Sequence, residues 1–410
     1  MKKTSRMLFR VVPFAVSLVA GAAAGASEVT VGAVGPLTGP AATSGLTWEK
    51  TFRYVLDQAS KSGEIVIDGT PATIKLIVED SQSKPDIGLS AAQKLLTRDN
   101  VDILTGDLIH SDVTLAVMEL ASSFPKFMYT GGGTSVGIGD KIAADPERYR
   151  YVWKHQLSSL AHARSAAGTI EMLAADGKVP VREKVIGVIA EDSGYSTPIL
   201  AELERILGEA GWKLQVEKVA MTQADFYPVL SKLLPQNPEF IVSIFTGTNS
   251  AIALTKQLKE QGSKSVHVGI NGPNLPGYLD AVGAAADGTV FLPMLFDPVN
   301  DTEHAKVAAE LTAALGDTEI GNLHVDAYCH GKVFVDILKR AGSVAPDKLA
   351  EAAANTSYVC LTGRWVFDAD THSPKLGPGF LPDPSGQIMG GKRSIIWPKE
   401  VATGEFQTAE

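Results

Sequence analysis

The chain has 410 residues, with 37 basic and 46 acidic side chains and a formal net charge of −9. A chain of this length exceeds one ordinary hydrophobic core and favours two domains of about 150 to 200 residues each. Its acidic balance lacks the basic surface with which proteins hold nucleic acid or anionic membranes, so we expect neither as a partner.

The first 26 residues have the pattern of a secretory signal peptide. Four basic residues, the last of them Arg10, precede an apolar stretch from Val11 to Ala24, and the small residues Ala24-Gly25-Ala26 end the segment. The apolar stretch is shorter than the about 20 residues that span a bilayer, which argues against a membrane anchor. We therefore expect residues 1–26 to be removed by cleavage after Ala26 and the remaining chain to be exported.

Strands and helices alternate along the next part of the chain. Short β-rich runs predict strands at 29–34, 73–78, 102–105 and 127–129. Apolar residues at helical spacing predict helices at 48–59, 87–96 and 113–120. Strands that alternate with helices of this length favour a parallel sheet with helices on both faces.

The same alternation starts again near residue 151. It predicts strands at 151–153, 184–190, 213–219, 240–244 and 266–270. The helices between them are predicted at 157–173, 197–209, 227–234 and 251–261. This second half is therefore also doubly wound.

The last part of the chain is predicted to return to the first half. Helices at 305–315 and 325–340 are followed by strand-like segments at 363–368 and 394–397. The predicted fold class is thus α/β, with two doubly wound parallel-sheet lobes. Such lobes form a cleft at the carboxyl ends of their strands, where helix N-termini offer free N–H groups to an anion.

Several motifs occur in a characteristic order along this pattern. The segment VGPLTGP at 34–40 follows the first strand, and Glu79-Asp80-Ser81 follows the second. Further motifs lie at 224–233, at 237–240 and at 396–404. Together they resemble the leucine/isoleucine/valine-binding protein family, the receptors of branched-chain amino-acid-type ABC transporters.

The resemblance implies a type I periplasmic binding protein whose two lobes are joined by a three-segment hinge. One lobe would comprise residues 27–151 and 275–356, and the other 152–274 and 357–410. Hinge closure would capture a small polar solute, such as a carboxylate, an amide or an amino-acid-like molecule, in the periplasm. An inner-membrane ABC permease would then receive it, and the chain itself would be no enzyme.

Three residues of the first lobe match ligand-binding positions of the family. Ser111 opens a predicted helix, where a serine caps the helix and can also bind a carboxylate. Gly132 and Thr134 lie in a glycine-rich loop after a strand, and glycine lets the backbone approach a ligand closely. Spacing alone favours a plain helix cap for Ser111, a flexible loop is the alternative for Gly132 and Thr134, and the resemblance favours binding.

Four residues of the second lobe complete the predicted site. Tyr195, in Asp192-Ser-Gly-Tyr195, matches the family's aromatic contact, although Ser196 stands where the family has glycine. Thr246 and Thr248 lie in a strand-to-helix loop, where capping of the next helix is the alternative role. Asn271 follows the strand at 266–270.

Asn271 is also a departure from the family pattern. Amino-acid binders of this family carry an acid here that pairs with the ligand's ammonium, whereas asparagine offers a neutral donor and acceptor. Ser44 likewise replaces an aromatic residue of the first loop. We therefore expect a ligand that is not a simple zwitterionic amino acid. The alternative is that another acid, with Asp107 and Asp112 as candidates, supplies the missing charge.

Two functions other than solute binding are alternatives for this sequence. The segment Gly133-Thr-Ser-Val-Gly137 has the G-x-S-x-G pattern of a serine hydrolase with Ser135 as nucleophile. That reading requires a strong amphipathic helix after the serine, and the sequence that follows does not predict one. A sensory receptor domain of the same fold would be expected to continue into a membrane segment.

Metal and cofactor motifs are not found in the sequence. No HExxH, EF-hand or Walker A pattern occurs, so we expect no metal, nucleotide or cofactor. His110 and His155 lie beside the predicted cleft loops and are expected to be buried or surface histidines rather than ligand contacts. Cys329 and Cys360 either form a disulfide in an oxidising compartment or remain as two buried thiols, and the sequence leaves both open.

Overall fold

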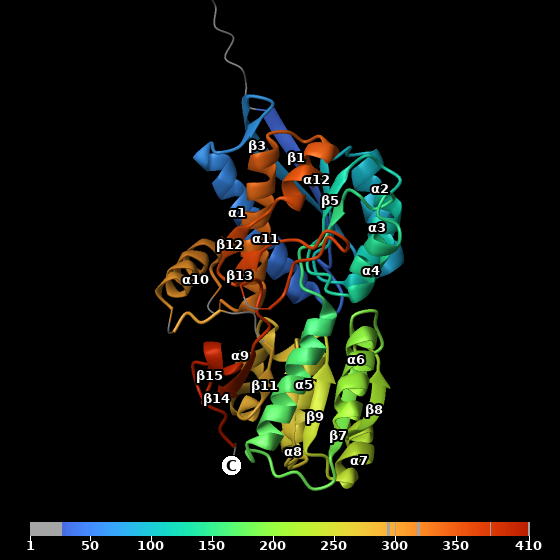
Figure 1. Ribbon diagram of the computed structural model, residues 1–410, viewed down its shortest axis with the longest axis vertical. Coiled ribbons are helices and arrows are strands. Elements are labelled where there is room, and N and C mark those ends of the chain that lie inside the picture. Colours follow the sequence, from blue (N-terminus) through green and yellow to red (C-terminus); the bar gives the residue numbers. More distant parts are fainter. Residues whose placement is uncertain (1–26, 293–295, 300, 318–319, 378, 409–410) are drawn as a thin grey trace, which may run out of the picture.

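The computed structural model describes residues 27–292, 296–299, 301–317, 320–377 and 379–408. The described chain forms two α/β lobes that lie one above the other (Figure 1). The predicted signal peptide at residues 1–26 lies outside the described part. Within the described residues, no helix combines the length and the apolar character needed to cross a membrane.

The first lobe is built on a six-stranded sheet of order β2-β3-β1-β4-β5-β6. Its strands are β1 (Ser27–Gly35), β2 (Val66–Ile67), β3 (Thr70–Asp80), β4 (Ile103–Asp107), β5 (Phe127–Tyr129) and β6 (Val152–Trp153). All neighbours pair in parallel except β2 and β3. The apolar residues of β1 and β4 are buried, as expected of parallel strands covered on both faces.

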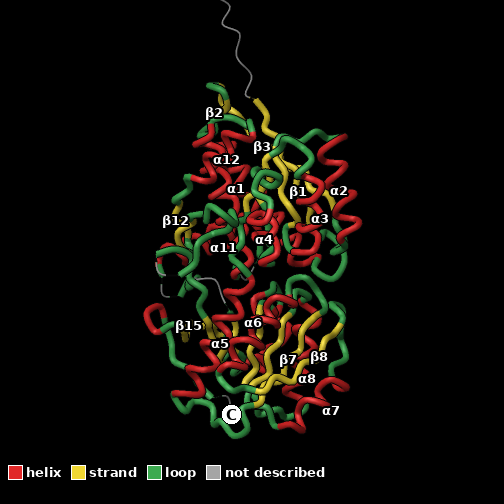
Figure 2. Tube along the Cα trace, turned by 45° about the vertical axis from the view of Figure 1, so that its right-hand side comes forward, coloured by secondary structure: helices red, strands yellow, loops and turns green. Residues whose placement is uncertain are grey.

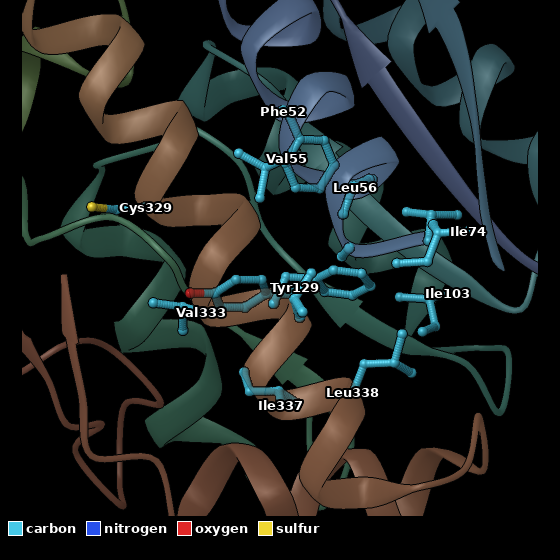
Figure 3. Packing of buried hydrophobic residues seen from close by; sticks show 14 of the residues in the cluster. Phe52, Val55, Leu56, Ile74, Ile103, Tyr129, Cys329, Val333, Ile337 and Leu338 are labelled. Carbon is cyan, nitrogen blue, oxygen red and sulfur yellow. The ribbon is translucent and has the colours of Figure 1, made fainter. Parts of the chain in front are cut away.

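Helices from both ends of the chain cover this sheet. They are α1 (Ala42–Ser62), α2 (Pro85–Thr97), α3 (Ser111–Ala121), α4 (Val136–Ala144), α10 (Thr302–Leu315), α11 (Asn322–Ala341) and α12 (Pro346–Ala354). Phe52 and Val55 on α1 share a core with Val333 and Ile337 on α11 (Figure 3). Full burial of such side chains stabilises the fold by about 1.5–3 kcal/mol each. The late helix α11 is therefore an integral part of the first lobe.

The second lobe contains a seven-stranded sheet of order β15-β14-β11-β10-β9-β7-β8. Its strands are β7 (Val185–Glu191), β8 (Lys213–Val219), β9 (Phe240–Ile244), β10 (Val266–Ile270), β11 (Val290–Phe291), β14 (Ser385–Met389) and β15 (Lys392–Trp397). Its helices are α5 (Ser159–Ala175), α6 (Ser196–Glu209), α7 (Tyr227–Leu233), α8 (Thr248–Glu260) and α9 (Tyr278–Val282). Figure 2 shows the central strands of this lobe between their helices. The predicted α/β fold of two doubly wound lobes is confirmed.

The chain crosses between the lobes three times, and the last two crossings lie further along than predicted. The second was predicted near 275, but β11 pairs in parallel with β10 and keeps this segment in the second lobe. Leu292 still belongs to a second-lobe core, whereas Phe296 packs in the first.

The third crossing was predicted near 357. The hairpin of β12 (Tyr358–Cys360) and β13 (Gly363–Trp365) instead packs on the first lobe, with Trp365 buried in its core. The crossing follows Leu381, which is in the same core, and precedes β14. The first crossing also differs slightly, because β6 is the edge strand of the first sheet. Strands of two or three residues give too little periodicity to assign them to a sheet from sequence.

A disulfide joins Cys329 on α11 to Cys360 on β12. Their Cα atoms lie 5.9 Å apart, within the usual range for such a bond. The sequence left a disulfide and two free thiols as alternatives, and the structure has the disulfide. It attaches the β12–β13 hairpin to the helix that contributes most to the late part of the first lobe.

Candidate functional site

A cavity of about 90 Å³ lies between the two lobes. The first lobe lines it with residues from α1, from the loops after β4 and β5 and from the start of α11. The second lobe contributes residues from α5 and from the loops that follow β7, β9 and β10. The cavity therefore lies at the carboxyl ends of parallel strands, where the sequence predicted a cleft.

The loop after β4 is fixed by the carboxylate of Asp107. One oxygen accepts the N–H groups of Ile109 at 2.8 Å and His110 at 2.6 Å, and the other accepts the Ser81 hydroxyl at 2.6 Å. Burial raises the pKa of Asp107. Both of its oxygens are thus engaged within the protein, and only Ile109 of this loop lines the cavity.

Ser111 supports the site from behind the cavity wall. It is the first residue of α3, and His110 rather than Ser111 occupies the capping position. The Ser111 hydroxyl accepts the backbone N–H of Ser135 at 3.0 Å. Ser111 is not among the residues that line the cavity. Its hydrogen bond is to the loop after β5 instead.

The loop after β5 presents Gly132 and Thr134 to the cavity. A Cβ atom on Gly132 would come within 2.4 Å of the carbonyl oxygen of Leu108, so the close packing of the two loops requires glycine. The Thr134 hydroxyl is buried and has no hydrogen-bond partner in the described protein, and the same holds for Ser44 on α1. A buried hydroxyl without a partner costs about 1–3 kcal/mol, which a bound ligand can recover.

Lys154 holds this loop from the protein interior. Its ammonium is buried and donates to the carbonyl oxygens of Thr134 at 2.8 Å and Ser135 at 3.0 Å. Burial lowers the pKa of Lys154 to about 7. Burial also lowers the pKa of His162, a cavity residue on α5, to about 4, with the Lys154 charge adding to the effect. When protonated, at pH values near and below 7, Lys154 places positive potential behind Thr134, which favours an anionic ligand group there.

In the second lobe, Tyr195 and Thr246 line the cavity. The Tyr195 hydroxyl forms a hydrogen bond of 3.2 Å with Nδ1 of His162. Thr246 donates its N–H at 2.8 Å and its hydroxyl at 2.7 Å to the buried carboxylate of Glu191. Burial raises the pKa of Glu191. These hydrogen bonds within the protein fix the second-lobe wall.

Asn271 and Thr248 have different positions relative to the cavity. Asn271 lines it, with a left-handed backbone (φ +66°) and its side-chain amide donating to Phe245 O at 3.2 Å. Thr248 opens α8 and does not line the cavity, although its buried hydroxyl has no partner in the described protein. The predicted residues that meet in the cavity wall are therefore Gly132, Thr134, Tyr195, Thr246 and Asn271.

The cavity wall also contains polar residues that the sequence did not predict. Asp326 on α11 is 4% exposed, and Gln156, Asn274 and Asn322 lie around the same cavity. One signal was present in the sequence: Asp326 shares a helix face with the apolar residue Val333 seven positions later. An acid on the buried face of a predicted helix is unusual, because buried charges are rare unless they are paired, and it therefore indicates a binding or structural role.

The lobes touch each other beside the cavity. Asn322 of the first lobe donates to the side-chain oxygen of Asn274 in the second at 2.9 Å. Gly194 of the second lobe donates its N–H to Asp112 on α3 at 3.1 Å. The structure therefore shows the lobes closed on one another, and Asp112 serves this contact.

Ser135 has a local structural contact. Its hydroxyl accepts the N–H of Gly137 at 3.2 Å and caps α4. The sequence predicted no strong helix after Ser135, whereas the structure has the nine-residue helix α4, whose first turn Ser135 caps.

Two doubly wound lobes that enclose a cavity define a type I periplasmic binding protein. The chain belongs to the periplasmic binding protein family, whose model matches residues 28–376, and within it to the leucine/isoleucine/valine-binding proteins. The resemblance inferred from the sequence motifs is thereby confirmed.

Relatives of known name match most of the chain. The leucine-, isoleucine-, valine-, threonine- and alanine-binding protein of Pseudomonas aeruginosa is 24% identical, over 90% of this chain and 93% of its own. A putative branched-chain amino acid ABC transporter structure from Silicibacter pomeroyi is 21% identical, with a TM-score of 0.78 over 93% of this chain and 99% of its own. A solute-binding protein from R. palustris in complex with benzoate is 18% identical, with a TM-score of 0.74 over 90% of this chain and 96% of its own.

Proposed function

We propose that this protein is the solute-binding component of an ABC transporter, without enzymatic activity of its own. It captures a small polar solute, a carboxylate, an amide or an amino-acid-like molecule, between its lobes and delivers it to an inner-membrane permease. The observation that carries the proposal is the interlobe cavity with the unpartnered Thr134 hydroxyl in its wall and Lys154 behind it. The names of two relatives support a carboxylate ligand, since leucine and benzoate both contain a carboxylate.

The ligand is held in this proposal by groups from both lobes. The Thr134 hydroxyl and the backbone of Gly132 bind its carboxylate or carbonyl oxygen, in the positive potential of Lys154. Tyr195 and Asn271 cover it from the second lobe. Ser111 and Thr248 act indirectly, because their side chains lie outside the cavity wall.

The location of the protein is part of the same proposal. Residues 1–26 act as a signal peptide, and cleavage after Ala26 releases the chain into the periplasm. The first strand begins at Ser27, so cleavage there would leave the fold intact. N-terminal sequencing of the periplasmic protein should start at Ser27, and a membrane-bound form that retains Met1 would contradict this.

A ligand screen with matched threonine variants tests the binding role. Thermal shift over amino acids, amides, urea and aromatic or short-chain carboxylates identifies the tightest ligand. Calorimetry then compares Thr134→Val with Thr248→Val, since both hydroxyls are buried without a partner but only Thr134 lines the cavity. We expect Thr134→Val to weaken binding about tenfold or more, the worth of one hydrogen bond to a charged group, and Thr248→Val to leave it within about threefold. Equal effects of the two variants would contradict the assigned site.

A further inference from the structure

Asp326 is an acid in the wall of the interlobe cavity. It lies in the second turn of α11, and its side chain is 6% exposed. Lysine, arginine and glutamate are not found among the described residues that line the cavity, and no second aspartate lines it. Burial keeps His162, the lining histidine, neutral at pH 7, since its pKa is about 4. Among the described residues that line the cavity, Asp326 is therefore the side chain that can carry a charge and interact with a charged ligand group.

The carboxyl of Asp326 is held in place but retains acceptor capacity. One oxygen is hydrogen-bonded to Nε2 of His155 at 3.2 Å, and the other accepts the side-chain amide of Gln156. Nδ1 of His155 is in turn hydrogen-bonded to the Tyr129 hydroxyl at 2.8 Å. Each carboxylate oxygen has two lone pairs, so one on each oxygen remains for a donor in the cavity.

The surroundings of Asp326 provide no cation of their own. Burial lowers the pKa of His155 to about 3, and the pKa of the neighbouring His330 well below its ordinary value. Tyr129 is buried, and its pKa lies well above its ordinary value. The groups that face Asp326 from β5, from the first crossing and from α11 are therefore neutral, and burial raises the pKa of Asp326 well above its ordinary value. A cationic ligand group would favour the ionised carboxylate, because it supplies the counter-charge that the surrounding protein groups lack.

Three other acids close to the cavity, Asp107, Asp112 and Glu191, already accept hydrogen bonds from the protein. Asp107 accepts two backbone N–H groups and the Ser81 hydroxyl, and Asp112 accepts the N–H of Gly194 in the opposite lobe. Glu191 accepts the two donors of Thr246. Asn271, at the position where amino-acid binders of the family carry an acid, is neutral.

We propose that Asp326 is the specificity-determining acid of the cavity and that it binds an N–H donor of the ligand, an ammonium or a primary amide. This inference rests on the proposed function and specifies its ligand class: a small molecule with an oxygen acceptor for Thr134 and a nitrogen donor for Asp326. The nitrogen of this ligand would lie beside Asp326 on α11. In family members with an acid at the position of Asn271, the ligand ammonium lies beside that acid in the second lobe.

Paired probes with and without the nitrogen test this in the unmodified protein. The pairs are leucine with 4-methylpentanoate, alanine with propanoate, and propanamide with propanoate, measured by calorimetry. In at least one pair we expect the nitrogen-bearing member to bind tenfold or more tightly than its partner. The amine and amide pairs separate the two kinds of donor. Tighter binding of every nitrogen-free member would overturn the inference while leaving the proposed function standing.

Variants then assign the preference to Asp326. Asp326→Asn, which keeps the shape and removes the acid, should weaken the nitrogen-bearing member of the preferred pair tenfold or more and change its partner less than threefold. Asp383→Asn is the matched control, because Asp383 is a partly buried acid with one buried carboxylate oxygen and lies outside this cavity. An unchanged ratio in Asp326→Asn overturns the inference. Should that variant fail to fold, the comparison in the unmodified protein still decides. Absence of binding by every probe and by the whole ligand screen would overturn the proposed function and this inference with it.

Discussion

The ammonium of Lys154 lies beneath the loop that carries Thr134, away from solvent. Its pKa falls from an ordinary value of 10.5 to about 7, because burial disfavours the charged form. Between these two pH values the unfolded chain binds a proton that the folded chain lacks. Raising the pH through this window removes that advantage of the unfolded chain and stabilises the folded protein by about 1.4 kcal/mol per pH unit.

Lys154→Met tests this pH dependence. In urea unfolding at several pH values between 7 and 10, the free energy of unfolding of the unmodified protein should rise with pH relative to that of the variant. Other titrating groups cancel in the difference between the two proteins. A difference that stays constant across the window would show that Lys154 keeps its ordinary pKa. Below pH 7, where Lys154 is protonated, the variant should also bind carboxylate ligands more weakly, since it loses the positive potential behind Thr134.

Individual site residues were predictable from sequence where they follow a strand directly. Gly132, Thr134 and Asn271 come just after β5 and β10, and the carboxyl ends of parallel strands meet at the cleft. Whether they contact a ligand stays a prediction. Asp326 was not predictable in this way, because it is on a helix and reaches the cavity only through the packing of α11 against α1, far apart in the sequence.

At the scale of elements, the disulfide anchors α11 one turn beyond Asp326. It closes a loop with a sequence separation of 31 residues and attaches the β12–β13 hairpin to the helix. A cross-link over a loop of this length stabilises the folded state by about 2–4 kcal/mol, mainly by restricting the unfolded chain. Neither cysteine lines the cavity, so the bond supports the site without contacting a ligand.

The double variant Cys329→Ala/Cys360→Ala measures this contribution. We expect its free energy of unfolding to be lower by about 2–4 kcal/mol, with ligand affinity nearly unchanged. Reductant should lower the stability of the unmodified protein to a similar extent and should not affect the variant. If reductant leaves the urea midpoint of the unmodified protein unchanged, the bond contributes no stability.

The long elements were the predictable part of the fold. Helices such as α1 and α6 show a full apolar stripe, and strands such as β7 and β9 are continuous runs of Val and Ile or similar residues. The short helix α4 and the two-residue strand β11 were missed. Such short elements are determined by contacts with segments distant in the sequence. The strand β11, for example, is defined by its pairing with β10 and β14.

At the scale of the whole molecule, closure brings Gly194 against Asp112. A Cβ atom on Gly194 would lie 1.9 Å from an oxygen of the Asp112 carboxylate. Such a contact exists only while the lobes are closed. In the closed form Asp112 must move away from any group added at Gly194 and so disturb its hydrogen bond to the Gly194 N–H, whereas the open form is unaffected.

Gly194→Ala should weaken binding of the best ligand from the screen by about tenfold or more, equivalent to about 1.4 kcal/mol. The melting temperature of the ligand-free protein should change little. Gly208→Ala is the matched control, because it lies on the following helix and its added Cβ meets no atom within 4 Å. X-ray scattering should show less compaction on ligand addition in Gly194→Ala than in the control. Equal affinities of the two variants would argue against the closed contact.

The three crossings of the chain have a consequence for the order of folding. The first lobe has its sheet strands by residue 153, but its core also requires α11 and β13, which end at residues 341 and 365. The first lobe thus cannot complete its native core until most of the chain is available. The sheet of the second lobe is likewise incomplete without β14 and β15. Contacts between such distant segments slow folding. A chain threaded through a membrane from its amino terminus would therefore stay extended until translocation is almost complete, and neither lobe would block the passage by folding early.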